Sequence, residues 1–393
     1  MKMAMIYADN SATTKVKAEV LEKMLPFFKE QYGNPSSLYG FAYASKRAVE
    51  EAREKVAHVI GAKSREIFFT SCGSESDNWA LRGVASKFGS GHIITSAIEH
   101  PAIMSTCRYL EKKGFRVTYL PVSELGEVRI EDVKNAICDD TILISIMTAN
   151  NEIGTIQPIA EIGKIAKEKK ILFHTDAVQA YGHIPINVDE MNIDLLSLSG
   201  HKIGAPKGIG ALYVRTGIKL DSLICGGGQE RGRRAGTENV PYIVGLGEAA
   251  EISEREMEDN IKKLTGMRDR LIERVTKLPY TRLTGHPQNR LPGLCSIVVE
   301  GIEGEALLLN MYNEGVCASS GSACSSGSLD PSHVLLAIGL PHHIAHGSLR
   351  LSLGDGNEVG DEIKIAEAVE RVVEKLRAMS PVWENGKPVW EEM

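Results

Sequence analysis

One lysine of this sequence follows a short apolar stretch and is placed so that its amine could react. Lys202 ends the run Ser-Gly-His-Lys at 199–202 and precedes a segment rich in glycine and proline at 204–210. A lysine that is held at the edge of a sheet and partly desolvated can lose its proton and form an imine with an aldehyde. Ser199 and His201 beside it can hold phosphate oxygens. A solvated loop lysine is the competing interpretation.

An acidic residue stands at a similar place. Asp176 follows the stretch 171–175, whose first half is apolar. A carboxylate there can pair with a protonated ring nitrogen and keep it charged, which makes a pyridine ring an electron sink. Gln179, three residues further on, could reach a ring hydroxyl. The alternatives are that Asp176 caps a helix and that Gln179 is a surface amide.

Two segments have the composition of anion sites. Residues 70–76, with Gly73 and Ser74 at their centre, offer small residues and hydroxyls where a strand is expected to give way to a helix. Backbone N–H groups at such a helix start bind phosphate, although a generic helix cap is the alternative. The run 226–237 places arginines and Thr237 after three glycines, which suits a phosphate or a carboxylate but also a solvated turn. Neither segment is a Walker A loop.

One cysteine stands apart from the others. Cys324 lies in a run of serines, glycines and alanine at 319–328, a composition typical of a mobile loop. An exposed thiol is an oxidation liability unless its reactivity is used, so a catalytic thiol is as well supported as an incidental one. The remaining six are predicted to be small core residues: Cys72, Cys107, Cys138, Cys225, Cys295 and Cys317.

The elements that would position these residues form an α/β pattern. Apolar runs at 67–69, 93–95, 142–146, 171–173 and 195–198 are separated mostly by helical segments such as 101–114 and 157–169. Such runs indicate a parallel sheet covered on both faces, which binds ligands at the carboxyl ends of its strands. Polar residues follow those ends directly, including His100 after the second run and Asn151 after the third.

The rest of the chain suggests a second, smaller domain. Helical stripes are expected at 15–31, with a kink at Pro26, and at 43–60. From about residue 241 the chain becomes helical, supplies short strands near 294–300 and 348–353, and closes on an amphipathic helix through 365–376. We expect residues 15–257 to form a large domain and residues 258–393 a small α+β domain. Residues 1–14 would associate with the small domain, which would carry the cysteine loop at about 317–330.

Composition excludes several functions. The 393 residues hold 45 Lys and Arg against 51 Asp and Glu, a net charge of −6 with no basic run, which argues against nucleic-acid or membrane binding. No apolar run approaches the length that crosses a bilayer, and no secretory signal begins the chain. Seven scattered cysteines without a CxxC pair suggest reduced thiols in a cytoplasm and no structural zinc. A thiol carrier or a metal-binding protein that uses these cysteines and the 11 histidines is an alternative of a different class.

Taken together, these segments resemble the pyridoxal-phosphate (PLP) cysteine desulfurases of the NifS/IscS type, within the class-V aminotransferases. The resemblance runs from Tyr7 to about Pro381, and the run 228–239 is nearest the nitrogen-fixation-type members. Its most specific motifs are Tyr7 to Thr14, Gly33-Asn34-Pro35-Ser36-Ser37, Ala149 to Gly154, His174 to Gln179, Ser199 to Lys202 and Ser319 to Cys324.

The resemblance implies the fold and the roles of individual residues. The fold would be PLP fold type I, a mainly parallel sheet of the seven-stranded type between helices, with a smaller α+β C-terminal domain. Lys202 would bind PLP covalently and move the substrate α-proton, and His100 would stack on the ring. The other cofactor contacts would come from Asp176 at the ring nitrogen, Gln179 at the ring hydroxyl, Gly73, Ser74, Ser199 and His201 at the phosphate, and Thr237 of a partner subunit.

The reaction implied is removal of sulfur from L-cysteine. Asn151, Arg350 and Asn34 would bind the substrate, and Cys324 would attack its sulfur and carry it as a persulfide, leaving L-alanine. The resemblance implies a homodimer in the cytoplasm that uses no metal. The sulfur acceptor would be an iron–sulfur scaffold protein of the NifU/IscU type, with tRNA-thiolation carriers as the alternative. A selenocysteine lyase or an aminotransferase of the same fold is the nearest alternative. Departures from the family pattern, such as Cys72 and Tyr39, remove no catalytic group.

Overall fold

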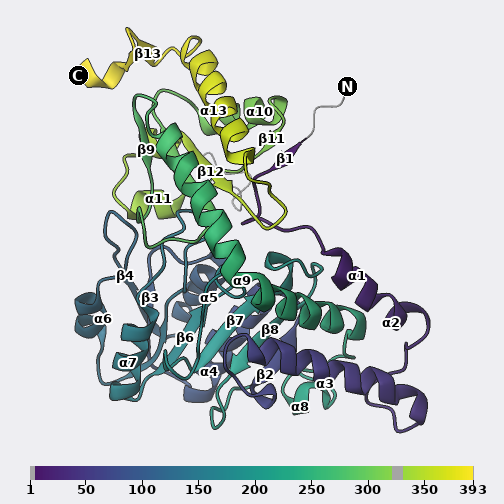
Figure 1. The fold of residues 1–393 in the computed structure, drawn as a ribbon. Coiled ribbons are helices and arrows are strands. Elements are labelled where there is room, and N and C mark those ends of the chain that lie inside the picture. The colour runs from purple at the N-terminus through teal and green to yellow at the C-terminus, as the bar shows by residue number, and fades with distance from the viewer. Residues whose placement is uncertain (1–4, 321–330, 393) are drawn as a thin grey trace.

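A seven-stranded sheet forms the centre of the computed structural model, which describes residues 5–320 and 331–392 (Figure 1). The predicted apolar runs are its strands, because branched and aromatic side chains suit a sheet that is buried on both faces. In spatial order the strands are β2 (Ile67–Thr70), β8 (Gly210–Val214), β7 (Leu195–Ser199), β6 (Leu172–Asp176), β5 (Thr141–Ser145), β3 (His92–Ser96) and β4 (Arg116–Leu120).

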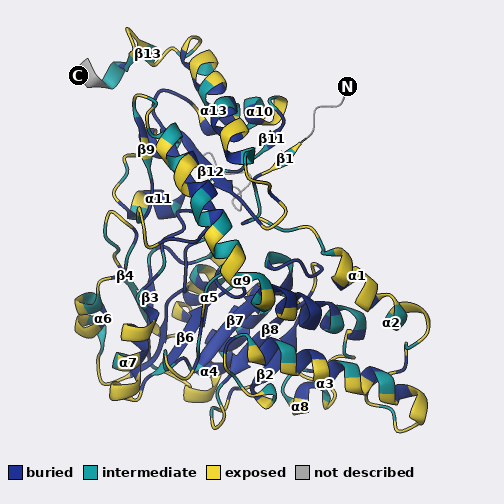
Figure 2. Cartoon of the chain, in the orientation of Figure 1, coloured by how far each residue is buried: buried dark blue, intermediate teal, exposed yellow. Residues whose placement is uncertain are grey.

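Helices cover both faces of this sheet. Side chains of α4 (Gly73–Phe88) and α5 (Pro101–Glu111) pack on one face, where Trp79 and Ile103 meet Leu143. The opposite face is covered by α1 (Ala18–Met24), α3 (Tyr43–His58), α6 (Ile130–Ala136), α7 (Ile159–Lys169) and the first part of α9 (Val240–Val275). The strands are therefore buried, while the outer faces of the helices are exposed (Figure 2).

The direction of the strands places six of the seven carboxyl ends at one edge. The pairs β7–β6, β6–β5, β5–β3 and β3–β4 are parallel. Only β8 runs the other way, between β7 and β2, so β2 again points in the common direction. The residues that follow Thr70, Ser96, Ser145, Asp176 and Ser199 consequently meet at the same edge.

The C-terminal part of the chain builds its own smaller core. A three-stranded antiparallel sheet, β12–β10–β9, packs against the second part of α9 and against α13. A parallel pair, β1–β11, and a β13–β14 hairpin complete it. Its elements are β1 (Ile6–Tyr7), β9 (Thr281–Leu283), β10 (Leu294–Val299), α10 (Gly304–Asn313), β11 (Val316–Cys317), α11 (His333–Ala337), α12 (His342–Ala345), β12 (Ser348–Ser352), α13 (Asp361–Arg377), β13 (Trp383–Glu384) and β14 (Lys387–Pro388).

One helix spans the predicted boundary between residues 257 and 258. The 36-residue helix α9 contributes Leu246 and Ala249 to the core of the large sheet and Met267 and Leu271 to the C-terminal core. Both apolar clusters therefore share this helix, and the division into domains at residue 257 stays a prediction.

The structure adds to the central sheet two strands that were not predicted, β4 and β8, and it places two of the six cysteines at the surface. Strand β4 is partly exposed and holds no continuous apolar run. Strand β8 is buried and does hold one, at 211–214, but this run directly follows a glycine-rich turn and was not predicted as a strand. Cys138 and Cys225 are exposed, and only Cys107 and Cys295 among the six are buried. The prediction of small core residues is therefore wrong for Cys138 and Cys225.

None of the helices in the described ranges is long and apolar enough to cross a bilayer.

Candidate active site

A pocket of about 300 Å³ opens where the five strand ends meet. It collects residues that lie far apart in the chain, because each follows a different strand or begins a helix at this edge. The predicted site residues that line it are Gly73, Ser74, His100, Asn151, Asp176, Gln179, Ser199, His201, Lys202 and Arg350.

Lys202 stands on the short turn that follows β7, a 3-10 segment over Gly200–Lys202. Its ε-amine reaches the N-terminal segment, where Nζ donates hydrogen bonds to the backbone carbonyls of Ser11 and Ala12. Gln179 Nε2 donates to the same Ser11 carbonyl at 2.9 Å. The lysine therefore sits at the ligand edge of the sheet, as the sequence predicts.

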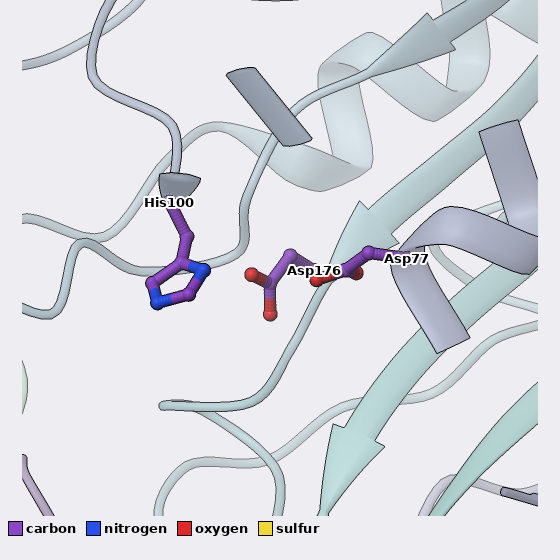
Figure 3. A group of neighbouring side chains, drawn as sticks. All are labelled: Asp77, His100 and Asp176. Atoms are coloured by element: carbon purple, nitrogen blue, oxygen red, sulfur yellow. The ribbon is translucent and has the colours of Figure 1, made fainter. Parts of the chain in front are cut away.

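Asp176 is the last residue of β6 and its carboxyl group faces the pocket. Burial raises its pKa, while His100, the Val178 N–H and Lys202 act in the opposite direction and favour the carboxylate. The Val178 N–H donates to Asp176 Oδ1 at 2.9 Å. His100 caps α5, with Nδ1 accepting from the Ala102 N–H at 3.1 Å. Figure 3 shows the imidazole of His100 across from this carboxylate, with Asp77 behind it.

The start of α4 forms one end of the pocket. Cys72 is the cap residue, and its side chain makes no capping hydrogen bond, so the N–H groups of the first turn are open to an anion. A Cβ on Gly73 would stand 2.7 Å from a methyl group of Val178, so only glycine lets the helix approach this closely. Ser74, Ser199 and His201 stand around it.

Arg350 approaches the pocket from β12. Its guanidinium donates to the Asn151 carbonyl at 3.0 Å and to Asp9 at 2.9 Å, and it is almost fully buried. Its Nε finds no hydrogen-bond partner among the described residues. A buried guanidinium with an unused donor beside the Asn151 amide is suited to a carboxylate.

These groups fit PLP. The open helix start suits its phosphate, Lys202 its aldehyde carbon and the Asp176 carboxylate its ring nitrogen. Asp77 Oδ1, buried in the lining, accepts no hydrogen bond from the described residues and lies 3.7 Å from Nε2 of His174. One oxygen each of Asp77 and Asp176 and one nitrogen of His100 also lie within 4.8 Å of one another, a spacing that a metal ion would accept. A metal would use neither Lys202 nor the helix start, so PLP accounts for more of the pocket.

Two of the predicted residues that the structure describes are not brought to this pocket. Asn34 and Thr237 are exposed and do not line it, so a role for either stays a prediction. Cys324 lies outside the described residues. Ser11, Ala12, Asp77, Met147, Ala149 and Val178 line the pocket although sequence reasoning assigned them no role.

The signal for some of these was present in the sequence. Ser11 and Ala12 belong to the Tyr7–Thr14 motif, and Ala149 belongs to the motif that contains Asn151. Asp77 gives no local signal, because its place in the pocket depends on the angle at which α4 leaves β2.

Comparison with known proteins defines the class of the molecule. A family model for class-V aminotransferases matches residues 6–363. A solved structure titled NifS-like protein superposes with a TM-score of 0.88 at 40% identity, covering 95% of this chain and 99% of that one. With the fold and the pocket, these matches establish that the chain belongs to the class-V aminotransferase family of PLP fold type I.

Curated relatives narrow this to one branch of the family. The protein of Methanosarcina thermophila named cysteine desulfurase IscS is 58% identical over 379 residues, 96% of this chain and 94% of that protein. A Clostridium botulinum protein of the same name is 56% identical over 385 residues, 97% of each chain. The predicted resemblance to cysteine desulfurases of the NifS/IscS type is confirmed. Membership of the nitrogen-fixation-type group in particular stays a prediction.

Proposed function

We propose that this protein is a PLP-dependent cysteine desulfurase that removes sulfur from L-cysteine, releases L-alanine and holds the sulfur as a persulfide on Cys324. The observation that carries this proposal is the meeting of Lys202, Asp176 and the open start of α4 in one pocket. When bound, PLP would supply an electron sink that acidifies the substrate's α-carbon and weakens the bond between the β-carbon and sulfur.

Different residues of the pocket bind the substrate, bind the cofactor and transfer the proton. Arg350 and Asn151 hold the substrate carboxylate, which fixes the amino acid against the pocket wall. Asp176 keeps a negative charge at the ring nitrogen, His100 covers the ring, and the start of α4 with Ser199 and His201 holds the phosphate. Lys202 binds the cofactor covalently at rest and takes the α-proton when the substrate is in place.

The sulfur step needs a thiolate. Cys324 attacks the substrate sulfur and forms a sulfur–sulfur bond. The bond between that sulfur and the β-carbon breaks, and its electron pair stays with the carbon skeleton. Protonation of the β-carbon then gives alanine. A neutral thiol is a poor nucleophile, so Cys324 reacts in its deprotonated form.

The purified protein tests this directly. With L-cysteine and dithiothreitol it is expected to form alanine and sulfide in equal amounts, with no amino transfer to a keto acid and with the absorbance near 420 nm that the family displays. Lys202→Ala is expected to lose at least a hundredfold in turnover, the contribution of a positioned acid–base group. An exposed lysine of α7, changed as Lys164→Ala, is the control. Transfer to a keto acid, or full activity of Lys202→Ala, would contradict the proposal.

A homodimer and a scaffold acceptor complete the proposal. Large apolar side chains at the surface concentrate in residues 21–43, among them Phe28, Tyr32 and Leu38, which supports a protein interface there. Thr237, exposed and outside its own pocket, would then complete the partner's phosphate site. An iron–sulfur scaffold protein in the cytoplasm would take the sulfur, in keeping with the IscS name of the relatives.

A further inference from the structure

The turn that carries Lys202 is held by a hydroxyl group of the N-terminal segment. Thr14 Oγ1 donates to the His201 carbonyl at 2.9 Å and accepts from the Gly204 N–H at 2.9 Å. The Thr14 N–H donates to the same His201 carbonyl, also at 2.9 Å. One residue therefore bridges the backbone groups on both sides of Lys202. A hydroxyl can do this because it has both a proton to donate and lone pairs to accept.

The N-terminal segment lies directly against this turn. Gly204 has φ of +84°, and a Cβ there would stand 2.8 Å from Cγ of Lys17. The Lys17 N–H donates to the Gly204 carbonyl at 3.0 Å. Glycine thus permits both the left-handed turn and the close approach of the segment.

The side chain of Lys202 ends on the same segment. Its Nζ donates to the carbonyls of Ser11 and Ala12, the latter at 2.8 Å. Two carbonyl oxygens are suited to an ammonium group, because hydrogen bonds from a charged donor are strong. Residues 11–14 therefore hold both the main chain around Lys202 and, in this state, its ε-amine.

We propose that Thr14 is a positioning residue for Lys202: it fixes the 201–204 turn so that the ε-amine passes between the cofactor and the carbonyls of Ser11 and Ala12 without movement of the main chain. The inference rests on the proposed role of Lys202. Lys202 must leave the cofactor when substrate binds and then take the α-proton at hydrogen-bond distance. Its long side chain reaches that point reproducibly only from a fixed backbone.

The test separates positioning from simple stabilisation. Thr14→Val keeps the shape of the side chain and removes both hydrogen bonds of the hydroxyl, whereas Thr14→Ser keeps the hydroxyl. Thr276→Val is the matched control, because the Thr276 hydroxyl bonds only to the Ile272 carbonyl at the end of α9. The measurements, made on the holoenzymes, are deuterium uptake at the Gly204 amide and exchange of the α-proton of L-alanine in D2O, a proton transfer that does not require Cys324.

For Thr14→Val we expect faster deuterium uptake at Gly204 and α-proton exchange slowed about three- to tenfold at saturating alanine, the range for the loss of one or two hydrogen bonds. Thr14→Ser and Thr276→Val are expected to match the wild type in both. Should valine not be accommodated, Thr14→Ala carries the same expectation. Exchange within about twofold of wild type, with Gly204 deprotected, would overturn the inference. Undiminished exchange in Lys202→Ala would instead refute the role of the lysine itself.

Discussion

Burial, more than any single partner, sets the protonation of the polar groups around the pocket. It lowers the pKa of His201 to about 4 and that of His174 to about 3, so both imidazoles are neutral at neutral pH. It raises the pKa of Glu99, just before His100, to about 8. Burial also raises the pKa of Asp176, while His100, the Val178 N–H and Lys202 favour its carboxylate, the form that the proposed pairing with a ring nitrogen requires.

The buried side chain of Glu99 is expected to make the stability of the protein depend on pH. Its carboxyl group is fully buried, and Oε2 has no described partner. Because its folded pKa, about 8, lies above that of an unfolded glutamate, folding binds a proton between about pH 4.5 and 8 and stability falls across that window. Glu99→Gln removes the proton uptake. The variant is expected to be more stable than wild type at pH 8, by roughly 2–4 kcal/mol, and the difference is expected to shrink towards pH 5.

Urea unfolding with saturating PLP at pH 5 and pH 8 measures this. Glu305→Gln, at an exposed position on α10, is the control and is expected to leave the pH dependence unchanged. A Glu99→Gln curve parallel to that of wild type would show that the carboxyl group is ionised throughout the window.

At the level of helices and loops, a buried ion pair attaches the largely exposed segment 226–239 to helix α3. Arg53 on α3 binds Glu230 through two hydrogen bonds of 2.7 and 3.0 Å, with each side chain about 3% exposed. Glu230 and Arg231 both adopt positive φ, of 45° and 57°, which non-glycine residues keep only when their surroundings enforce it. The ion pair therefore maintains the conformation of the segment that carries Thr237.

Breaking this pair is expected to be costly. Arg53→Met leaves the Glu230 carboxylate buried without its partner and is expected to lower the free energy of unfolding by about 3–5 kcal/mol. Arg47→Met, on the same helix but in an exposed ion pair with Glu51, is expected to change it by less than about 1 kcal/mol. Chemical denaturation of the two variants gives both values. Equal, small effects would mean that the segment holds its shape without the pair.

The sequence predicts the central strands and most of the pocket because both depend on local pattern. Apolar runs with polar residues after them place His100, Asn151, Asp176 and Lys202 at one sheet edge. Strand β4 lacks such a run because it is partly exposed. The apolar run of β8, at 211–214, directly follows a glycine-rich turn, which hides the start of the strand. The hydrogen bonds of Thr14 to the 201–204 turn join segments far apart in the chain, so no local sequence pattern predicts them.

At the scale of the whole molecule, the N-terminal segment joins the two cores across the pocket. Asp9 pairs with Arg350 of β12 at 2.9 Å, and Lys17 pairs with Asp355 and with Glu256 of α9. The same segment carries the carbonyls that receive Lys202. Arg350 and Lys202, the residues proposed to bind the substrate and to move its proton, are therefore connected through one segment.

The central claim is that sulfur leaves L-cysteine and comes to rest on Cys324. The protein is mixed with one equivalent of L-cysteine without reductant, alkylated and digested, and each cysteine peptide is weighed by mass spectrometry. We expect alanine in solution and one added sulfur atom on the Cys324 peptide. The added sulfur is lost in Cys324→Ala and retained in a Cys225→Ala control. Added sulfur on another cysteine, or alanine formed at the wild-type rate by Cys324→Ala, would contradict it.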